Sequence, residues 1–248
     1  MSMLKNKSNE NSNKIRHRIN IFLDILIITV GVISLAVAGV LIYQKSYLTP
    51  FWVNGQSMYP TLNKDAMKKN GTLSGETGSS AQAGDYHLDY GVMDCHERAI
   101  KKLKRFDIVV LYRDQMKTEK LIKRVIGLPG ETIKFTSLES GEDKNGDLYI
   151  KDGDSYTYIQ QPIDDHFKVN SNRNAYPKED IVLGSNEYYV LGDNRGHSND
   201  SRTYGKFTFD LIVGKVVAIC GYCSIDFNKE NSLYPTNITY YKWPRFIK

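Results

Sequence analysis

The sequence predicts a mostly β extracytoplasmic domain that follows a single N-terminal transmembrane helix. Three observations predict this fold class. Residues Ile21–Tyr43 form an almost unbroken apolar stretch. After it, short runs rich in β-branched residues recur between turn residues, and no long amphipathic helix pattern competes with them. The predicted strands are Phe106–Tyr112, Lys120–Ile126, Glu131–Phe135, Asp147–Ile150, Tyr188–Leu191 and Leu211–Ile219.

As a helix, the apolar stretch would be about 35 Å long, enough to cross the hydrocarbon of a bilayer. The alternatives are a buried core helix and a cleaved signal sequence. The lack of amphipathic alternation disfavours the first, and the closing Tyr43-Gln44-Lys45, which is no small-residue cleavage site, disfavours the second. Basic residues precede the stretch, so we expect a cytoplasmic tail over residues 1–20, a span of the cell membrane over 21–43 and an extracytoplasmic catalytic domain over 44–248. These basic residues are Lys5, Lys7, Lys14, Arg16 and Arg18.

The formal net charge is +5. Much of the excess lies in the N-terminal tail, where membrane topology explains it, and no nucleic-acid-binding motif is present, so we expect no nucleic-acid partner. Cys95, Cys220 and Cys223 are too few for a disulfide framework. The CxxC spacing of the last two leaves a redox or zinc site as an alternative. It has no second CxxC, however, and residues three apart on a strand point to opposite faces.

Residues Asn63–Lys104 lie between the segment around Ser57 and the next predicted strand. They form a longer link than we expect there, and we interpret them as an insertion loop. Within it, Asn70–Gly84 is rich in Gly, Ser and Thr and lacks periodicity. Cys95-His96-Glu97 in the same region suggests a metal site, but no companion ligands are spaced for it, so a solvated loop is the favoured interpretation. Ser140–Asp147 is predicted to be an exposed turn.

Two residues far apart in the sequence indicate chemistry. Ser57 lies in a turn-rich segment, and Lys123 alternates with Leu121 and Val125 on one face of a predicted apolar strand. Burial would disfavour the ammonium form of Lys123 and bring its pKa toward the range of a general base, and Arg124 would help by repulsion if it were close. Taken singly, Ser57 could be a turn serine and Lys123 a surface lysine whose stem lies along apolar groups.

A third block, Gly192–Gly205, is polar, rich in turn residues and directly follows a predicted strand, which is typical of a functional loop. Together with Ser57, Lys123 and the strand Arg105–Val110, it resembles the type I signal peptidases, serine protease family S26. In that family these motifs occur in this order after a membrane anchor. The resemblance extends from Ile21 to about Gly221.

The resemblance implies a membrane-anchored serine endopeptidase that removes signal peptides from exported preproteins, cleaving after small residues through an acyl-enzyme. It implies Ser57 as the nucleophile, Lys123 as its base and Ser198 as the residue that orients the lysine. Asp193, Asp200 and Arg202 match positions that brace the loop. No cofactor or metal is implied. The partners would be signal peptides and the lipids of the cell membrane, with which the aromatic and cationic C-terminal residues Tyr240–Lys248 could also associate.

The oxyanion hole is the least defined part of the predicted site. The backbone N–H of Ser57 is the first expected donor. Some relatives add a serine hydroxyl two positions earlier, but this chain has Gly55 there, so the second donor would be a backbone N–H or a water.

Three alternatives compete with this interpretation. His197 could be the base, although relatives that use histidine carry it at the position that Lys123 occupies here. A self-cleaving repressor would share the dyad but needs no anchor and should carry a DNA-binding module. A catalytically degenerate relative that works as a binding or assembly factor would keep the fold and lose the chemistry.

Overall fold

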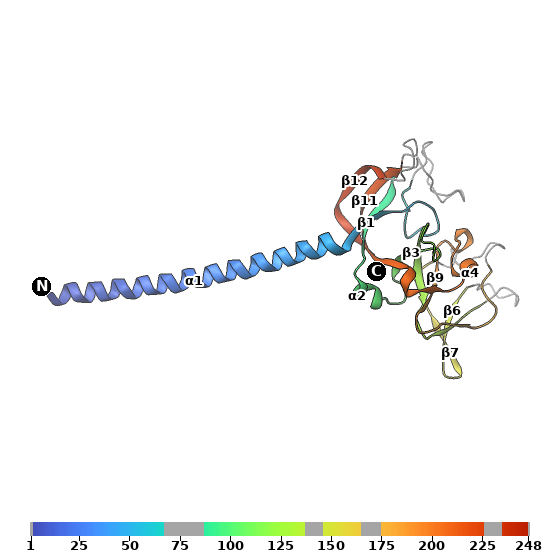
Figure 1. Ribbon diagram of the computed structural model, residues 1–248, viewed down its shortest axis with the longest axis horizontal. Helices are drawn as coiled ribbons and strands as arrows, with labels where there is room; N and C mark the ends of the chain where they lie inside the picture. The colour runs from blue at the N-terminus through green and yellow to red at the C-terminus, as the bar shows by residue number, and fades with distance from the viewer. Residues whose placement is uncertain (1, 67–86, 137–145, 165–174, 226–234, 248) are drawn as a thin grey trace. The chain divides into compact units, whose positions relative to one another are not determined.

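The computed structural model describes residues 2–66, 87–136, 146–164, 175–225 and 235–247, and divides the chain into two compact units, 1–47 and 48–248. The first unit is one unbroken helix, α1 (Ser2–Tyr47), which Figure 1 shows in blue. Within α1, Arg16–Tyr43 is long and apolar enough to cross a membrane, and all its side chains are exposed.

The second unit is built on a large antiparallel sheet. Its strands follow the order β1-β2-β11-β3-β4-β9-β10, and β12 adds to β11 beyond this path. Every pairing is antiparallel, as expected where hairpins and returning strands replace helical crossovers. The strands are β1 (Leu48–Trp52), β2 (Leu88–Asp94), β3 (Ile108–Tyr112), β4 (Lys120–Gly127), β9 (Glu187–Leu191), β10 (Phe207–Thr208), β11 (Ile212–Ile225) and β12 (Pro235–Phe246).

A smaller antiparallel sheet has the order β7-β6-β5-β8. Figure 1 shows its hairpin of β6 and β7 projecting at the end of the domain away from β12. Its strands are β5 (Thr132–Phe135), β6 (Leu148–Asp152), β7 (Ser155–Ile159) and β8 (Ile181–Val182). Short helices connect the strands: α2 (Glu97–Lys101), η2 (Arg195–His197), α4 (Ser201–Tyr204) and η3 (Phe209–Leu211).

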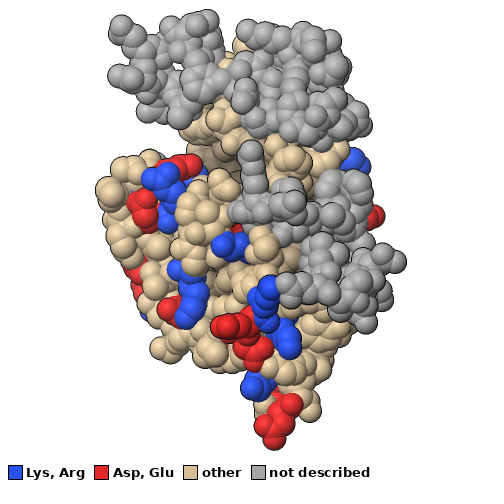
Figure 2. All heavy atoms as spheres, turned by 90° about the vertical axis from the view of Figure 1, so that its right-hand side faces the viewer, with Lys and Arg blue, Asp and Glu red and all other residues tan. Residues whose placement is uncertain are grey.

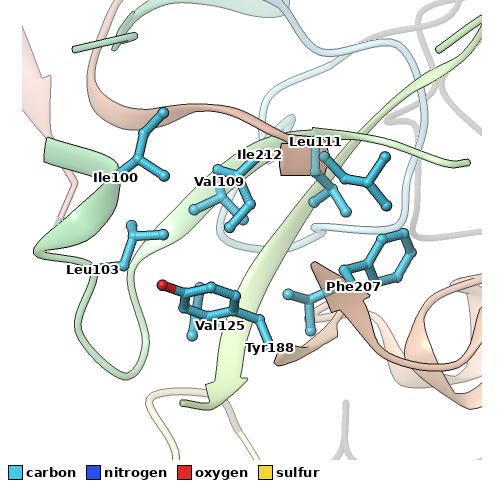
Figure 3. Close-up of a cluster of buried hydrophobic side chains, with 10 residues drawn as sticks. Ile100, Leu103, Val109, Leu111, Val125, Tyr188, Phe207 and Ile212 are labelled. Carbon is cyan, nitrogen blue, oxygen red and sulfur yellow. The ribbon is translucent and has the colours of Figure 1, made fainter. Parts of the chain in front are cut away.

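The core explains why these strands pair. Along β11, buried and half-buried residues alternate, as a strand with one face against the core requires. Figure 3 shows Val109 and Leu111 of β3, Val125 of β4 and Tyr188 of β9 converging on one buried cluster. A second cluster contains Met58, the residue after Ser57, together with Val53 and Val110, so the predicted nucleophile is adjacent to a packed side chain. At about 25 cal/mol per Å² of buried apolar surface, such clusters supply the main stabilisation of the sheet.

The mostly β fold class is confirmed, but the sequence did not predict the short helices or the strands β1, β2, β7, β8, β10 and β12. Strand β1 follows α1 without a break, and β12 is a long strand in a segment for which the sequence predicted no strand. The interpretation of Asn63–Lys104 as one insertion loop is wrong over its C-terminal part, because β2 pairs with both β1 and β11 and α2 follows it. The loop predictions for Asn70–Gly84 and for most of Ser140–Asp147 lie outside the described residues.

Charges on the surface are mixed in sign. Figure 2 shows basic and acidic side chains interleaved over the described part of one face of the molecule. Several of the exposed cations pair with carboxylates, among them Lys101 with Glu97 and Lys206 with Glu187. On this face, therefore, the described side chains form no broad basic patch of the kind that nucleic acid requires.

Candidate active site

Ser57 and Lys123 lie in contact. Ser57 is in the turn that follows β1, and Lys123 is in the middle of β4, opposite Val109 of β3. The Nζ atom of Lys123 is 2.8 Å from the Oγ atom of Ser57, and it also donates to the carbonyl oxygen of Ile122 at 2.9 Å. These two contacts fix the direction of a side chain that is only 3% exposed. The fold thus joins the two residues that the sequence separates.

The environment of Lys123 suits a base. Burial lowers its pKa from 10.5 to about 8, while the carboxylates of Asp200 and Asp193 act in the opposite direction and Arg202 lowers it further. A neutral amine is therefore accessible near pH 8, and the Ser57 hydroxyl can donate to its lone pair. The repulsion suggested for Arg124 is not among the causes of this shift, because neighbouring residues of a strand point to opposite faces and the Arg124 guanidinium binds Asp193.

The loop after β9 holds the backbone around Ser57. The N–H of Asn194 donates to the Ser57 carbonyl at 3.0 Å, and its side-chain amide donates to the Gln56 carbonyl at 3.3 Å. At Gly192 an added Cβ would lie 2.5 Å from the Ser57 carbonyl oxygen and 2.2 Å from the Oγ of Ser198. Only glycine fits there, so Gly192 lets the loop approach Ser57 closely.

Asp193 is buried in an ion pair with Arg124. The guanidinium donates from Nε at 2.7 Å and from Nη2 at 2.6 Å, one nitrogen to each carboxylate oxygen. Thr61, four residues after Ser57, donates its hydroxyl to the same carboxylate at 2.5 Å. The pair thereby connects β4, the loop after β9 and the segment that carries Ser57.

Asp200 and Arg202 form a second ion pair, 2.8 Å long, in which neither side chain is exposed. It is therefore not an exposed surface ion pair, which would contribute little to stability. Burial opposes ionisation of Asp200, but the charge and hydrogen bonds of Arg202 and the hydrogen bond from the Gly192 N–H bring its pKa below the ordinary value. Arg202 also donates to the Arg195 carbonyl at 2.8 Å, so it connects two parts of the same loop.

The expected oxyanion donor is the backbone N–H of Ser57. Among the described residues, no oxygen accepts from the Ser57 N–H. Gly55 has φ +134°, a conformation that side chains rarely adopt, and its carbonyl accepts from Asn63 Nδ2 at 3.0 Å. With glycine here, the chain itself offers no hydroxyl at this position.

The remaining candidates are His197, the Cys95-His96-Glu97 segment and the cysteines. His197 is exposed in η2, and His96 caps α2 by accepting from the Arg98 N–H at 2.9 Å, so the Cys95-His96-Glu97 segment begins a helix and is not a solvated loop. Cys223 is buried, and burial raises the pKa of its thiol to about 11, the opposite of an activated cysteine. Within the described parts of the chain, no group of three or more metal-ligating side chains is found.

Sequence reasoning missed three residues that shape this site, namely Arg124 as an ion-pair partner, Asn194 and Thr61. One signal was present for the first. Arg124 alternates with Ile122 and Ile126 in an apolar strand, and a buried guanidinium requires a carboxylate partner.

Comparison with known proteins agrees with these motifs. The family model described as "Signal peptidase, peptidase S26" matches residues 26–221. The chain is similar to signal peptidase IB of Staphylococcus aureus strain Mu50, 31% identical over 195 residues that cover 75% of this chain and 85% of the relative. It is also similar to signal peptidase I S of Bacillus subtilis strain 168, 30% identical over 195 residues that cover 73% and 82%. A solved structure of a signal peptidase I from Enterococcus faecalis V583 is 28% identical, covers 46% of this chain and 96% of that chain, and has a TM-score of 0.34.

Proposed function

Because the chain belongs to the signal peptidase family, peptidase S26, and is a serine peptidase, we propose that it removes N-terminal signal peptides from exported preproteins with a dyad of Ser57 and Lys123. The observation that carries the dyad is the 2.8 Å contact between Lys123 Nζ and Ser57 Oγ. A buried lysine with a pKa of about 8 has the proton affinity that a base needs near neutral pH.

In the proposed reaction, the Ser57 oxygen attacks the carbonyl carbon of the scissile bond and its proton passes to the Lys123 amine. The tetrahedral intermediate then collapses, and the Lys123 ammonium returns that proton to the departing amine of the mature protein. Water attacks the resulting ester, again losing a proton to Lys123, and the proton returns to Ser57. The Ser57 N–H would stabilise the oxyanion, with Gly55 offering no side-chain donor and a backbone N–H or water completing the hole.

The surrounding residues would position this chemistry. We assign Ser198 to orient the lysine, which is supported by its buried place against Gly192 beside the Ser57 carbonyl. Asp193, Asp200 and Arg202 would brace the loop through their ion pairs. Residues close to the dyad would accept small side chains before the cut, as the family resemblance implies.

We further propose that α1 anchors the protein in the cell membrane with the N-terminus in the cytoplasm and the catalytic unit outside. The basic residues before the span favour this orientation. The C-terminal strand would contact lipid, because Tyr240, Trp243 and Phe246 are 64%, 77% and 69% exposed on β12. Aromatic side chains of this kind favour the headgroup region of a bilayer.

Cleavage of a panel of secretory precursors tests the proposal. Membranes carrying the wild-type chain, Ser57→Ala or Lys123→Ala would be compared, and the new N-termini sequenced. Cuts after small residues that both substitutions abolish are expected. Cutting that survives Lys123→Ala would mean that another group is the base, and binding of precursors without any cutting by wild type would favour a degenerate binding or assembly factor.

A further inference from the structure

The segment that carries the nucleophile is held on both sides of Ser57. We call residues Gly55–Thr61 the nucleophile loop. On one side, Asn63 Nδ2 donates to the Gly55 carbonyl at 3.0 Å; on the other, Arg245 Nη1 donates to the Thr61 carbonyl at 3.1 Å. Arg245 comes from β12 at the far end of the sequence. These two backbone oxygens are therefore bound by side chains from outside the loop, as is the Gln56 carbonyl, which accepts from Asn194.

Two of the residues that bind the loop, Asn63 and Arg245, both bind one carboxylate. The Oδ2 atom of Asp89, in β2, accepts from the Asn63 N–H at 2.8 Å and from Arg245 Nη2 at 2.9 Å. The Asp89 N–H in turn donates to Asn63 Oδ1 at 2.7 Å, and the Asp89 carbonyl accepts from the Val53 N–H at 2.9 Å. Asn63 and Asp89 are 1% and 5% exposed. The loop thus rests on a buried, reciprocally bonded pair.

Arg245 closes this arrangement from the side of β12. It lies opposite Ile219 of β11, and the neighbouring Ile247 packs against the cluster that contains Met58. Burial raises the pKa of Asp89, whereas the Asn63 N–H and the Arg245 guanidinium act in the opposite direction. The arginine therefore helps to keep the carboxylate ionised as an acceptor for Asn63.

We propose that Arg245 and Asp89 are positioning residues that clasp the nucleophile loop and hold Ser57 within reach of Lys123. This inference rests on the proposed peptidase activity. Neither side chain has to touch substrate. A small displacement of a nucleophile from its productive geometry costs far more in turnover than in substrate binding, so loss of the clasp should lower kcat and leave KM almost unchanged.

The kinetic test uses the full-length protein in detergent with one precursor as substrate. Arg245→Ala should lower kcat about 10-fold, which is about 1.4 kcal/mol, with KM within a factor of about two, and Arg245→Lys should recover part of the loss because one nitrogen keeps the contact with Asp89. The matched control is Lys206→Ala, which removes a half-exposed cation paired with Glu187 far along the sheet. An Arg245→Ala enzyme with the turnover of the control, or with a change in KM alone, would overturn the clasp.

A second measurement is independent of activity. Amide hydrogen exchange of peptides covering residues 54–63 should be faster in Arg245→Ala and in Asp89→Asn than in wild type, and unchanged in Lys206→Ala. The comparison is repeated on the Ser57→Ala background, so it applies even if the chain proves to cleave nothing. Equal exchange in all four proteins would refute the clasp, whereas precursor cleavage that persists in Ser57→Ala would refute the proposed nucleophile and leave the exchange result standing.

Discussion

Replacing Lys123 with methionine should abolish cleavage and change how the stability of the catalytic unit depends on pH. The pKa of Lys123 is about 8 in the folded chain and 10.5 for an ordinary lysine. The difference corresponds to about 3 kcal/mol, at 1.36 kcal/mol per pKa unit. This is the free energy with which the fold opposes a buried ammonium.

Proton binding determines whether the free energy of unfolding rises or falls with pH. Between pH 8 and pH 10.5 the unfolded chain holds a proton on Lys123 that the folded chain has lost, so unfolding becomes harder as pH rises. From pH 7 to pH 10 the wild type should therefore gain about 2.5 kcal/mol from this residue. Below pH 8 both states are protonated and the slope vanishes. Lys123→Met removes the titrating group and with it the gain.

The assay is denaturant unfolding of the full-length protein in detergent at pH 7 and pH 10, followed by tryptophan fluorescence. The chain has two tryptophans, Trp52 and Trp243, and both lie in the second unit, so the signal reports that unit. Lys120→Met is the matched control, because Lys120 is an exposed lysine of the same strand. If the stability curves of Lys123→Met and wild type run parallel across this pH range, Lys123 titrates like an exposed lysine and the reasoning fails.

Three further substitutions test the rest of the site. Gly192→Ala places a methyl group 2.5 Å from the Ser57 carbonyl oxygen; we expect at least a 10-fold loss of kcat, and an unaffected rate would show that the loop yields easily. His197→Ala should leave the pH profile of cleavage unchanged, since the side chain is exposed; loss of a base titrating at pH 6 to 7 would make histidine the base instead. Arg202→Gln leaves Asp200 without its ion-pair partner and should move the alkaline rise of activity to higher pH. The double substitution Arg202→Gln with Asp200→Asn should restore the original pH profile. An unshifted profile in Arg202→Gln would show that the Arg202 charge does not affect Lys123.

The parts of the fold that sequence reasoning predicted are those with a strong local pattern. The β-branched run of β3 and the apolar alternation of β4 identify strands without help from partners. Lys123 was recognisable for a related reason, since a lysine on an apolar strand face requires an explanation. The family assignment is confirmed by the match over residues 26–221.

The parts that were missed depend on contacts between distant segments. Strand β12 is exposed along most of its length, so it shows no alternation, and only its pairing with β11 makes it a strand. Strand β2 contains charged and small residues, among them Asp89 and Gly91, and was therefore included in an insertion. At Gly91 an added Cβ would lie 2.4 Å from the Ala218 carbonyl oxygen, so this glycine reports a close approach of two strands that no local pattern reveals.

The two ion pairs of the site have a common electrostatic consequence. Asp193 and Asp200 both raise the pKa of Lys123, and either carboxylate, if unpaired in this buried site, would act as a counterion that keeps the lysine protonated. Each is instead bonded to an arginine, Asp193 to Arg124 at 2.6 Å and Asp200 to Arg202 at 2.8 Å. The carboxylates can then join three segments of the chain around Ser57 without supplying the negative charge that would disable the proposed base. Burial, and not charge pairing, therefore remains the largest cause of the shift in the pKa of Lys123.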